Sequence, residues 1–318
     1  MCLSGFSICQ ELPLLSHSTV NSFLYNPSLA GSDFDSKGTI YLVHKHSFSS
    51  IGGHPVLSMI SGNIPVNDFH IGIGGNIFYE KVNVLQTIYG SAAFSYHLLV
   101  DRYKRLSLGL SADMYYMGLN HDDLKLYNES LYDPIINEYE NGKMRLDFSA
   151  GFNYQTERLA IGGTINSLRA TIITSESEYS NYHSAYIKYS IPVFYQRDLI
   201  EPMITYRSIP FSTPQGSFGL YYSYKKQNTL GSLKDGYLIV GASISTNLSA
   251  GMTAGIRLLK RTKLFYNFES AGKYHKYLGY SNEITLRFDN VNLNYIEQGR
   301  EYHKWNQRRH LFHRWLRK

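Results

Sequence analysis

Apolar and polar residues alternate along most of the chain from residue 38 onward. The stretch 105–117, RLSLGLSADMYYM, shows this most clearly, because every second residue is apolar and those between are mostly small or polar. A period of two is that of a β-strand, whose successive side chains point to opposite faces. One face carries Leu106, Leu108 and Leu110, and the other carries Ser107, Gly109 and Ser111. We expect a strand with one apolar face and one wet face.

The same alternation predicts fourteen strands and no helical segment of useful length. Tyr, a good strand residue, occurs 28 times, whereas Pro occurs only 9 times. The predicted strands span 38–48, 54–62, 70–80, 86–98, 104–118, 143–156, 158–167, 184–193, 199–208, 215–226, 235–247, 250–259, 262–270 and 280–289. An even number of strands is typical of bacterial membrane barrels.

Two architectures can cover the apolar faces of such strands. A soluble sandwich turns them inward, whereas a transmembrane barrel turns them to lipid and keeps the polar faces inside. The second faces here carry charges and amides in mid-strand, which are costly in a dry core but acceptable in a wet lumen. No apolar run approaches the ~18 residues of a spanning helix. We predict an all-β fold, a transmembrane outer-membrane β-barrel of about 14 antiparallel strands at 38–289, with Leu106, Leu108 and Leu110 facing lipid.

The chain before the strands divides into two parts. Residues 1–9 hold both cysteines of the sequence, and we interpret them as a leader remnant. Residues 10–37 are predicted to be an N-terminal periplasmic segment. Within it Asn26-Pro27 starts a turn, because the residue before proline is pushed out of the helical region, and Gly31 closes the turn with a positive φ. We expect Asn26–Gly31 to fold at or into the periplasmic mouth of the barrel.

The connections favour a barrel with both chain ends in the periplasm. Outer-membrane barrels place their long loops outside the cell. The two longest predicted connections, 119–142 and 168–183, both follow odd-numbered strands and therefore fall outside. The first contains six acidic residues without the spacing of a calcium loop. We interpret it as a solvated surface loop available to an exported partner.

The basic charge of the chain lies at its end. The formal net charge is +6, and from residue 300 onward seven Lys or Arg residues stand against one Glu. Residues 290–318 are predicted to be a basic aromatic tail in the periplasm. As a helix it could lie on an anionic membrane surface, plug the barrel or dock on a partner, and we favour a periplasmic partner or the inner leaflet. The alternative is a disordered solvated tail. Nucleic-acid binding conflicts with an outer-membrane location. The candidate tail contacts are Tyr302, Trp305, Arg308, Arg309, Phe312 and Trp315.

Candidate chemistry is weak, and we expect no catalysis, no cofactor and no bound metal. The Gly-x-Ser-x-Gly, His-Glu-x-x-His and P-loop motifs are missing from the sequence. A Ser/His/Asn set spread over several strands, as in outer-membrane lipid hydrolases, is the enzymatic alternative. His44 and His46 share a strand face without an evident third ligand, so we interpret them as polar lumen or rim residues. Gly72–Gly75 lies inside a strand pattern and indicates close backbone approach or strand curvature.

Several motifs, taken in order, resemble one known family. They are Asn26-Pro27-Ser28-Leu29-Ala30-Gly31, Gly53-His54-Pro55, Gly72-Ile73-Gly74-Gly75-Asn76, the strand Leu106–Leu110 and the closing strand Glu283–Phe288. Over about residues 20–290, their spacing resembles the PorP/SprF family of type IX secretion membrane proteins. The resemblance implies a non-catalytic outer-membrane barrel of Bacteroidetes-type bacteria. Such a protein works with the type IX machinery to export or anchor cell-surface proteins, including gliding adhesins.

We therefore expect an outer-membrane accessory of type IX secretion that exports, anchors or holds a specific secreted surface protein. Its partners would be subunits of the secretion or gliding machinery, the secreted client and outer-membrane lipid. Asn26, Pro27 and Gly31 join the tail as candidate partner contacts. A passive or solute-selective porin is the main alternative, and a soluble periplasmic β-protein is a third.

Overall fold

The computed structural model describes most of the chain. The described residues are 20–33, 36–66, 70–101, 104–120, 142–168, 182–193, 198–208, 214–225, 237–246, 248–259, 261–272 and 275–290. The predicted leader 1–9 and the tail beyond residue 290 lie outside them, as do most of the two long connections.

Strands make up nearly all of the regular structure. Two short 3₁₀ helices, η1 (Ser22–Leu24) and η2 (Pro27–Leu29), precede the strands, and a single helical turn, α4 (His275–Leu278), precedes the last one. The strands are β1 (Thr39–His46), β2 (Val56–Val66), β3 (Ile71–Val82), β4 (Leu85–Asp101), β5 (Lys104–Leu119), β6 (Lys143–Gln155), β7 (Leu159–Asn166), β8 (Tyr182–Tyr189), β9 (Ile191–Val193), β10 (Asp198–Ser208), β11 (Gln215–Lys225), β12 (Tyr237–Ser245), β13 (Ala250–Leu259), β14 (Thr262–Ser270) and β15 (Tyr280–Asp289).

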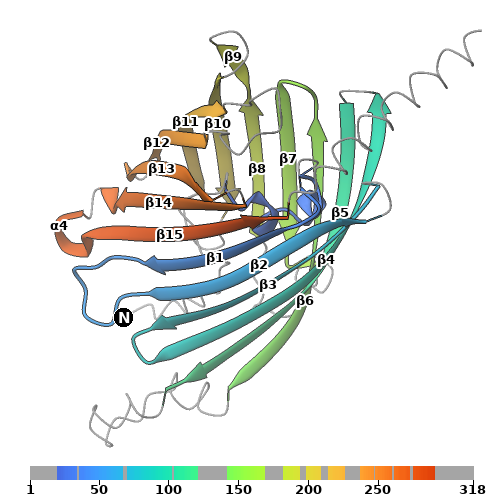
Figure 1. Cartoon of the computed structure of the whole chain (residues 1–318). Helices are drawn as coiled ribbons and strands as arrows, with labels where there is room; N and C mark the ends of the chain where they lie inside the picture. The colour runs from blue at the N-terminus through green and yellow to red at the C-terminus, as the bar shows by residue number, and fades with distance from the viewer. Residues whose placement is uncertain are drawn as a thin grey trace, which may run out of the picture.

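The strands form one closed antiparallel sheet (Figure 1). Apart from β8 and β9, which do not pair with each other, each strand pairs with its neighbours in the chain, and β1 also pairs with β15, which closes the barrel. β8 and β9 pair with successive parts of β10, so together they fill one position in the wall. The barrel therefore has fourteen positions, and the predicted fold class is confirmed.

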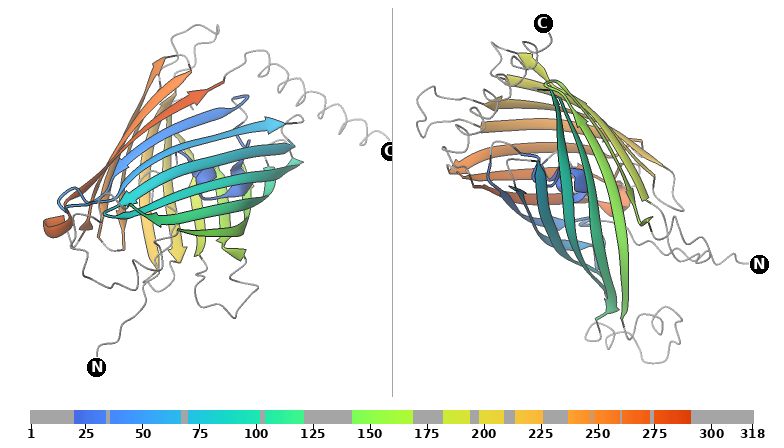
Figure 2. Two further views of the ribbon diagram at one scale, coloured as in Figure 1. Left: turned by 90° about the horizontal axis from the view of Figure 1, so that it is seen from below. Right: turned by 90° about the vertical axis from the view of Figure 1, so that its right-hand side faces the viewer.

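The two ends of the barrel differ. The start of β1 and the end of β15 lie together at one end, where Lys37 N–H donates to the Asn290 carbonyl at 2.9 Å and Asn290 N–H donates to the Gly38 carbonyl at 2.9 Å. Short connections such as 67–69, 102–103 and 156–158 are at this same end. At the opposite end lie the end of β5 and the start of β6, which flank 120–142, and the end of β7 and the start of β8, which flank 167–181 (Figure 2). We call these the short-turn end and the long-loop end.

The outer face of the barrel is apolar. Leu108 and Leu110 are 54% and 61% exposed there, and Leu106 on the same face is half-buried. Exposed apolar side chains line every part of the wall, including Ile60, Ile77, Phe94, Leu146, Phe148, Ile187, Ile204, Leu220, Ile244, Met252 and Ile284. A water-soluble protein rarely exposes so continuous an apolar surface. The apolar face of the predicted strand pattern is thus the outer face.

The inner face carries both polar and apolar side chains. Strand β5 turns Ser107, Gly109 and Asp113 inward, as the alternation predicts. On β1 to β4, however, Tyr41, Leu57 and Phe78 point inward and are buried. This apolar lining departs from the predicted wet lumen, and the physical reason lies in the segment before β1, which packs against it. Among the described residues, no helix is long and apolar enough to cross a bilayer.

Candidate functional site

The most elaborate polar site of the described chain is where residues 20–33 enter the lumen. This stretch, here called the N-terminal segment, lies inside the barrel near the short-turn end (Figure 2, dark blue). Its residues from Val20 to Gly31 are buried, apart from the half-buried Ser22. Helix η2 packs against the inner faces of β4, β5 and β6. The segment predicted to fold at or into the mouth therefore occupies the lumen.

Asn26 organises the fold of the segment. Its side-chain oxygen accepts hydrogen bonds from Ser28 N at 3.0 Å and Ser28 Oγ at 2.7 Å, which caps the first turn of η2. Pro27 suits the first helical position because its fixed φ fits the turn and its missing N–H is not needed there. Asn26 Nδ2 donates to the Phe152 carbonyl of β6 at 2.9 Å. One side chain thus shapes the turn and attaches it to the wall.

Glycines on the inner wall make room for the segment. A Cβ added at Gly72 would lie 1.9 Å from the Ala30 carbonyl oxygen, and one at Gly109 would lie 2.2 Å from Ser28 N. One at Gly151 would lie 2.2 Å from Asn26 Oδ1. The sequence-based expectation of close backbone approach in the Gly72–Gly75 run is confirmed at Gly72, and what approaches is the N-terminal segment.

The Ala30 carbonyl accepts two hydrogen bonds from β4. Ser95 Oγ donates at 2.7 Å, and His97 Nε2 lies at 2.9 Å. A carbonyl can only accept, so His97 Nε2 carries the hydrogen. His97 Nδ1 then accepts from Ser107 Oγ at 2.8 Å. Ser95, His97 and Ser107 are all fully buried, so these contacts form a polar floor beneath the segment.

Ser107 and His97 bear on the enzymatic alternative, a Ser/His/Asn set spread over several strands. His97 and Ser107 do form a Ser–His contact, but neither side chain is exposed to a substrate. The other ring nitrogen faces a backbone carbonyl rather than the carboxylate or amide that would orient a catalytic histidine. We interpret the pair as an anchor for the segment.

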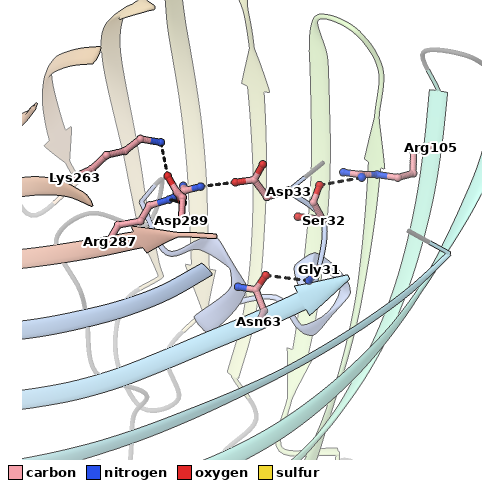
Figure 3. Close-up of polar contacts among 8 residues, drawn as sticks. All are labelled: Gly31, Ser32, Asp33, Asn63, Arg105, Lys263, Arg287 and Asp289. Carbon is pink, nitrogen blue, oxygen red and sulfur yellow. Dashed lines mark hydrogen bonds and ion pairs between the residues drawn. The ribbon is translucent and has the colours of Figure 1, made fainter. Parts of the chain in front are cut away.

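Charged residues hold the end of the segment (Figure 3). Asp33 forms an ion pair with Arg287 of β15. Arg287 Nε also donates to Asp289 Oδ1 at 2.6 Å, and Asp289 Oδ2 accepts from Lys263 Nζ of β14 at 2.8 Å. Two cations and two carboxylates therefore alternate across the seam of the barrel. Charge-assisted contacts of this kind are stronger than neutral hydrogen bonds.

Two further contacts fix the backbone beside Asp33 (Figure 3). Gly31 N–H donates to Asn63 Oδ1 at 3.1 Å, and Gly31 has the positive φ, 60°, that the sequence predicts. Arg105 Nη1 donates to the Ser32 carbonyl at 3.0 Å while Nη2 donates to Gln155 Oε1 at 2.7 Å. The segment is thus attached to β2, β5 and β15, all within the arc of the wall from β15 through β1 to β5.

The segment completes an apolar core inside the barrel. Its residues Val20, Leu24 and Tyr25 belong to one buried cluster with side chains from opposite walls. The cluster includes Tyr41, Val43, Leu57, Met59, Phe78, Tyr89, Met203, Tyr221, Ile239 and Phe265. The Arg207 guanidinium of β10 also lies 4.4 Å from the centre of the Tyr25 ring. This packing explains why part of the inner wall is apolar.

A cavity of about 340 Å³ remains beside the segment. It lies between the segment and the inner faces of β7, β8 and β10. Its lining includes Tyr25, Leu29, Asp33, Tyr186, Lys188 and Arg207. The segment therefore packs tightly against β4, β5 and β6, whereas its contacts toward β7, β8 and β10 leave space between them.

The histidines singled out from sequence lie on the outer face near the long-loop end. His44 Nε2 is 3.0 Å from His46 Nε2, and His46 Nδ1 is 3.1 Å from His54 Nε2. The structure thus places a third imidazole, that of His54, beside them, which the sequence pattern did not reveal. Within the described part of the chain, however, no group of three or more His, Cys, Asp or Glu side chains is arranged to hold a metal ion.

The other predicted site residues divide into two groups. Asn26, Pro27 and Gly31 are buried against the chain's own wall. The tail candidates Tyr302, Trp305, Arg308, Arg309, Phe312 and Trp315 lie outside the described residues. Sequence reasoning missed Asp33, His97, Arg105 and Arg287 as anchors. For His97, Arg105 and Arg287 the available signal was a charged or imidazole side chain on the second face of an alternating strand, and for Asp33 it was the single charge in residues 20–33.

Comparison with protein families gives one match that covers most of the chain. The model for "Type IX secretion system membrane protein PorP/SprF" matches residues 8–288. No curated relative matches the sequence significantly.

Solved structures with a similar fold are distant in sequence. The Pseudomonas putida toluene transporter TodX is 10% identical with a TM-score of 0.46, over 85% of this chain and 94% of that one. The KdgM porin in complex with disordered oligogalacturonate is 9% identical with a TM-score of 0.38, over 79% and 98%. Acinetobacter baumannii Omp33 is 7% identical with a TM-score of 0.46, over 80% and 99%. At these identities the likeness does not extend to function.

Proposed function

Since the chain belongs to the PorP/SprF family of type IX secretion system membrane proteins, we propose that it is an outer-membrane accessory that exports, anchors or holds a specific secreted surface protein. The observation that carries the proposal is the occupied lumen. The N-terminal segment shares a buried core with both walls, which leaves less of the lumen free for an extended client. We therefore propose that the client is held at the long-loop end rather than conducted through the barrel.

The proposed orientation follows from the two different barrel ends. In outer-membrane barrels the short turns face the periplasm and the long loops face outward. The N-terminal segment would then close the periplasmic mouth, and both chain ends would be periplasmic. The apolar outer face, including Leu106, Leu108 and Leu110, would contact lipid. The acidic connection 121–141 would meet the client, and the basic tail 291–318 would meet machinery subunits in the periplasm.

Affinity purification from native outer membranes, followed by mass spectrometry, tests this proposal. Two deletions form a matched pair. Replacing 121–141 with a short Gly-Ser linker should lose a large secreted protein and retain machinery subunits, because only the outward loop is altered. Removing 291–318 should lose the machinery subunits and retain the large secreted protein. Purification of the intact protein without any secreted or machinery protein would contradict the accessory role.

A porin is the second candidate, and the cavity beside the segment is the observation that favours it. A porin should purify alone and conduct ions steadily in planar bilayers.

The tail has a separate test, since a surface helix should gain helicity when the isolated peptide 290–318 meets anionic vesicles. Unchanged far-UV circular dichroism would count against that form.

A further inference from the structure

We propose that the N-terminal segment is a displaceable plug and that the ion pair between Asp33 and Arg287 is one of the contacts that hold it in the lumen, the one made by its only charged side chain. The inference goes beyond membership of the family and beyond the client, because it concerns how the lumen of this barrel opens. Four features of the described chain lead to it.

The first feature is how unevenly the segment is packed. Helix η2 contacts β4, β5 and β6 closely, while a cavity of about 340 Å³ lies beside the segment toward β7, β8 and β10, where Tyr25 still contacts Arg207. A permanent core fills space on all sides, because protein interiors are close-packed. The free volume lies on the side toward which the segment would have to move to leave its wall.

The second feature is a set of buried polar groups that lack hydrogen bonds. Asn21 of the segment is 2% exposed, and neither its Oδ1 nor its Nδ2 has a partner among the described residues. On the wall, Asn153 Nδ2 also lacks one. Each such group costs free energy that exposure to water would recover. These groups favour release of the segment from the lumen, and so offset part of the free energy that its packing against the wall contributes.

The third feature is the place of the charges. Asp33 is the single charged residue in 20–33, and it lies at the end of the segment, at the short-turn mouth. Its carboxylate balances Arg287 in a network that otherwise holds Lys263 and Asp289 (Figure 3). Withdrawing Asp33 would leave two cations against one carboxylate. The positive charge of Arg287 therefore favours the return of the Asp33 carboxylate, and with it of the segment, to its place in the lumen.

The fourth feature is what the segment covers. Val20, Leu24 and Tyr25 join inward side chains of β1 to β4 with those of β10 to β14 in one cluster. Removing these three side chains from the lumen would take away the part of the cluster that belongs to the segment. Displacement of the segment is thus the motion that would turn a closed barrel into a conducting one.

The test uses full-length protein in planar lipid bilayers, with Asp33→Asn as the principal variant. The wild type should open rarely. Asp33→Asn should raise the open probability roughly tenfold or more, because a charge-assisted hydrogen bond shifts a two-state equilibrium by about that factor. Asp33→Glu keeps the carboxylate and should stay near the wild type. Glu157→Gln removes the same charge from an exposed turn at the same end and should have no effect.

A thiol probe provides a second readout on folded protein. With Cys2 and Cys9 changed to serine, Ser28→Cys places the only thiol at a fully buried position of the segment. A membrane-impermeant maleimide should label it slowly, and adding Asp33→Asn should raise the rate by the same roughly tenfold factor. Steady conduction by the wild type would overturn the plug. Equal open probability and equal labelling with and without Asp33→Asn would overturn the ion pair as a holding contact.

Discussion

Asp33 and Arg287 come from opposite ends of the chain and form an ion pair inside the barrel (Figure 3). Arg287 lies on the last strand, 254 residues after Asp33 in the sequence. The two meet because β15 pairs with β1, the strand that directly follows the N-terminal segment. The contact therefore joins the occupant of the lumen to the seam where the barrel closes.

The glycine at position 109 should be required for the segment to seat. Gly109→Ala places a Cβ against the backbone of Ser28, which cannot move as easily as a side chain. We expect destabilisation of roughly 1 to 3 kcal/mol, as for other overpacked sites. Urea unfolding of protein in lipid vesicles measures it. Gly90→Ala is the matched control because a Cβ at Gly90 meets no atom within 4 Å. Equal stability of the two variants would argue against tight seating.

Asn26 should need its amide nitrogen as well as its oxygen. Asn26→Asp keeps an acceptor for Ser28 but loses the donor to the Phe152 carbonyl and turns a carboxylate oxygen toward it. We expect Asn26→Asp and Asn26→Ala each to lower the free energy of unfolding by roughly 1 to 3 kcal/mol. The same vesicle assay compares them. Wild-type stability in Asn26→Asp would show that the bond to the wall contributes nothing.

Ser95 and His97 should substitute for one another at the Ala30 carbonyl. Each single change to alanine leaves the other donor in place, whereas the double change leaves a buried carbonyl without a donor from β4. We therefore expect the double variant to cost more than the sum of the singles, by roughly 1 kcal/mol or more. A double-mutant cycle of unfolding free energies measures this difference. Strict additivity would contradict a shared acceptor.

The orientation of β5 can be tested at Leu108. Arginine there should destabilise the protein in lipid by roughly 2 to 4 kcal/mol if the outer face meets the middle of the bilayer. Leu108→Met keeps the side chain apolar and should cost little. Ser107 is not a tolerant lumen control, although it lies on the inner face, because it is fully buried and donates to His97. An arginine at Leu108 that unfolds no more readily than Leu108→Met would contradict lipid contact.

The strands were predictable from sequence because alternation is a local property. The predicted 104–118 is observed as Lys104–Leu119, and the predicted 250–259 is observed as Ala250–Leu259. The apolar lining of β1 to β4 was harder to predict. In Ile40–Val43 every residue is apolar, so a period of two cannot show that Tyr41 and Val43 face a core inside the barrel.

The contacts of the N-terminal segment were not predictable by the same reasoning. The turn at Asn26-Pro27 and the positive φ of Gly31 depend only on neighbouring residues, and both are observed. The partners are far away in sequence, since Asn26 bonds to the carbonyl of Phe152, 126 residues later. Only closure of the sheet determines which inward residues surround the segment.

The sequence by itself determined the strands, their apolar and polar faces and the turn at the start of the chain, because each depends on the conformation of neighbouring residues. The tertiary structure decided where the turn goes and what holds it. Barrel closure brings Arg287, Arg105 and His97 from three separate strands to one short segment. A lumen that the alternating pattern predicted to be wet is instead partly occupied by the chain's own N-terminal segment, whose apolar side chains join a core with both walls and whose backbone accepts hydrogen bonds from β4.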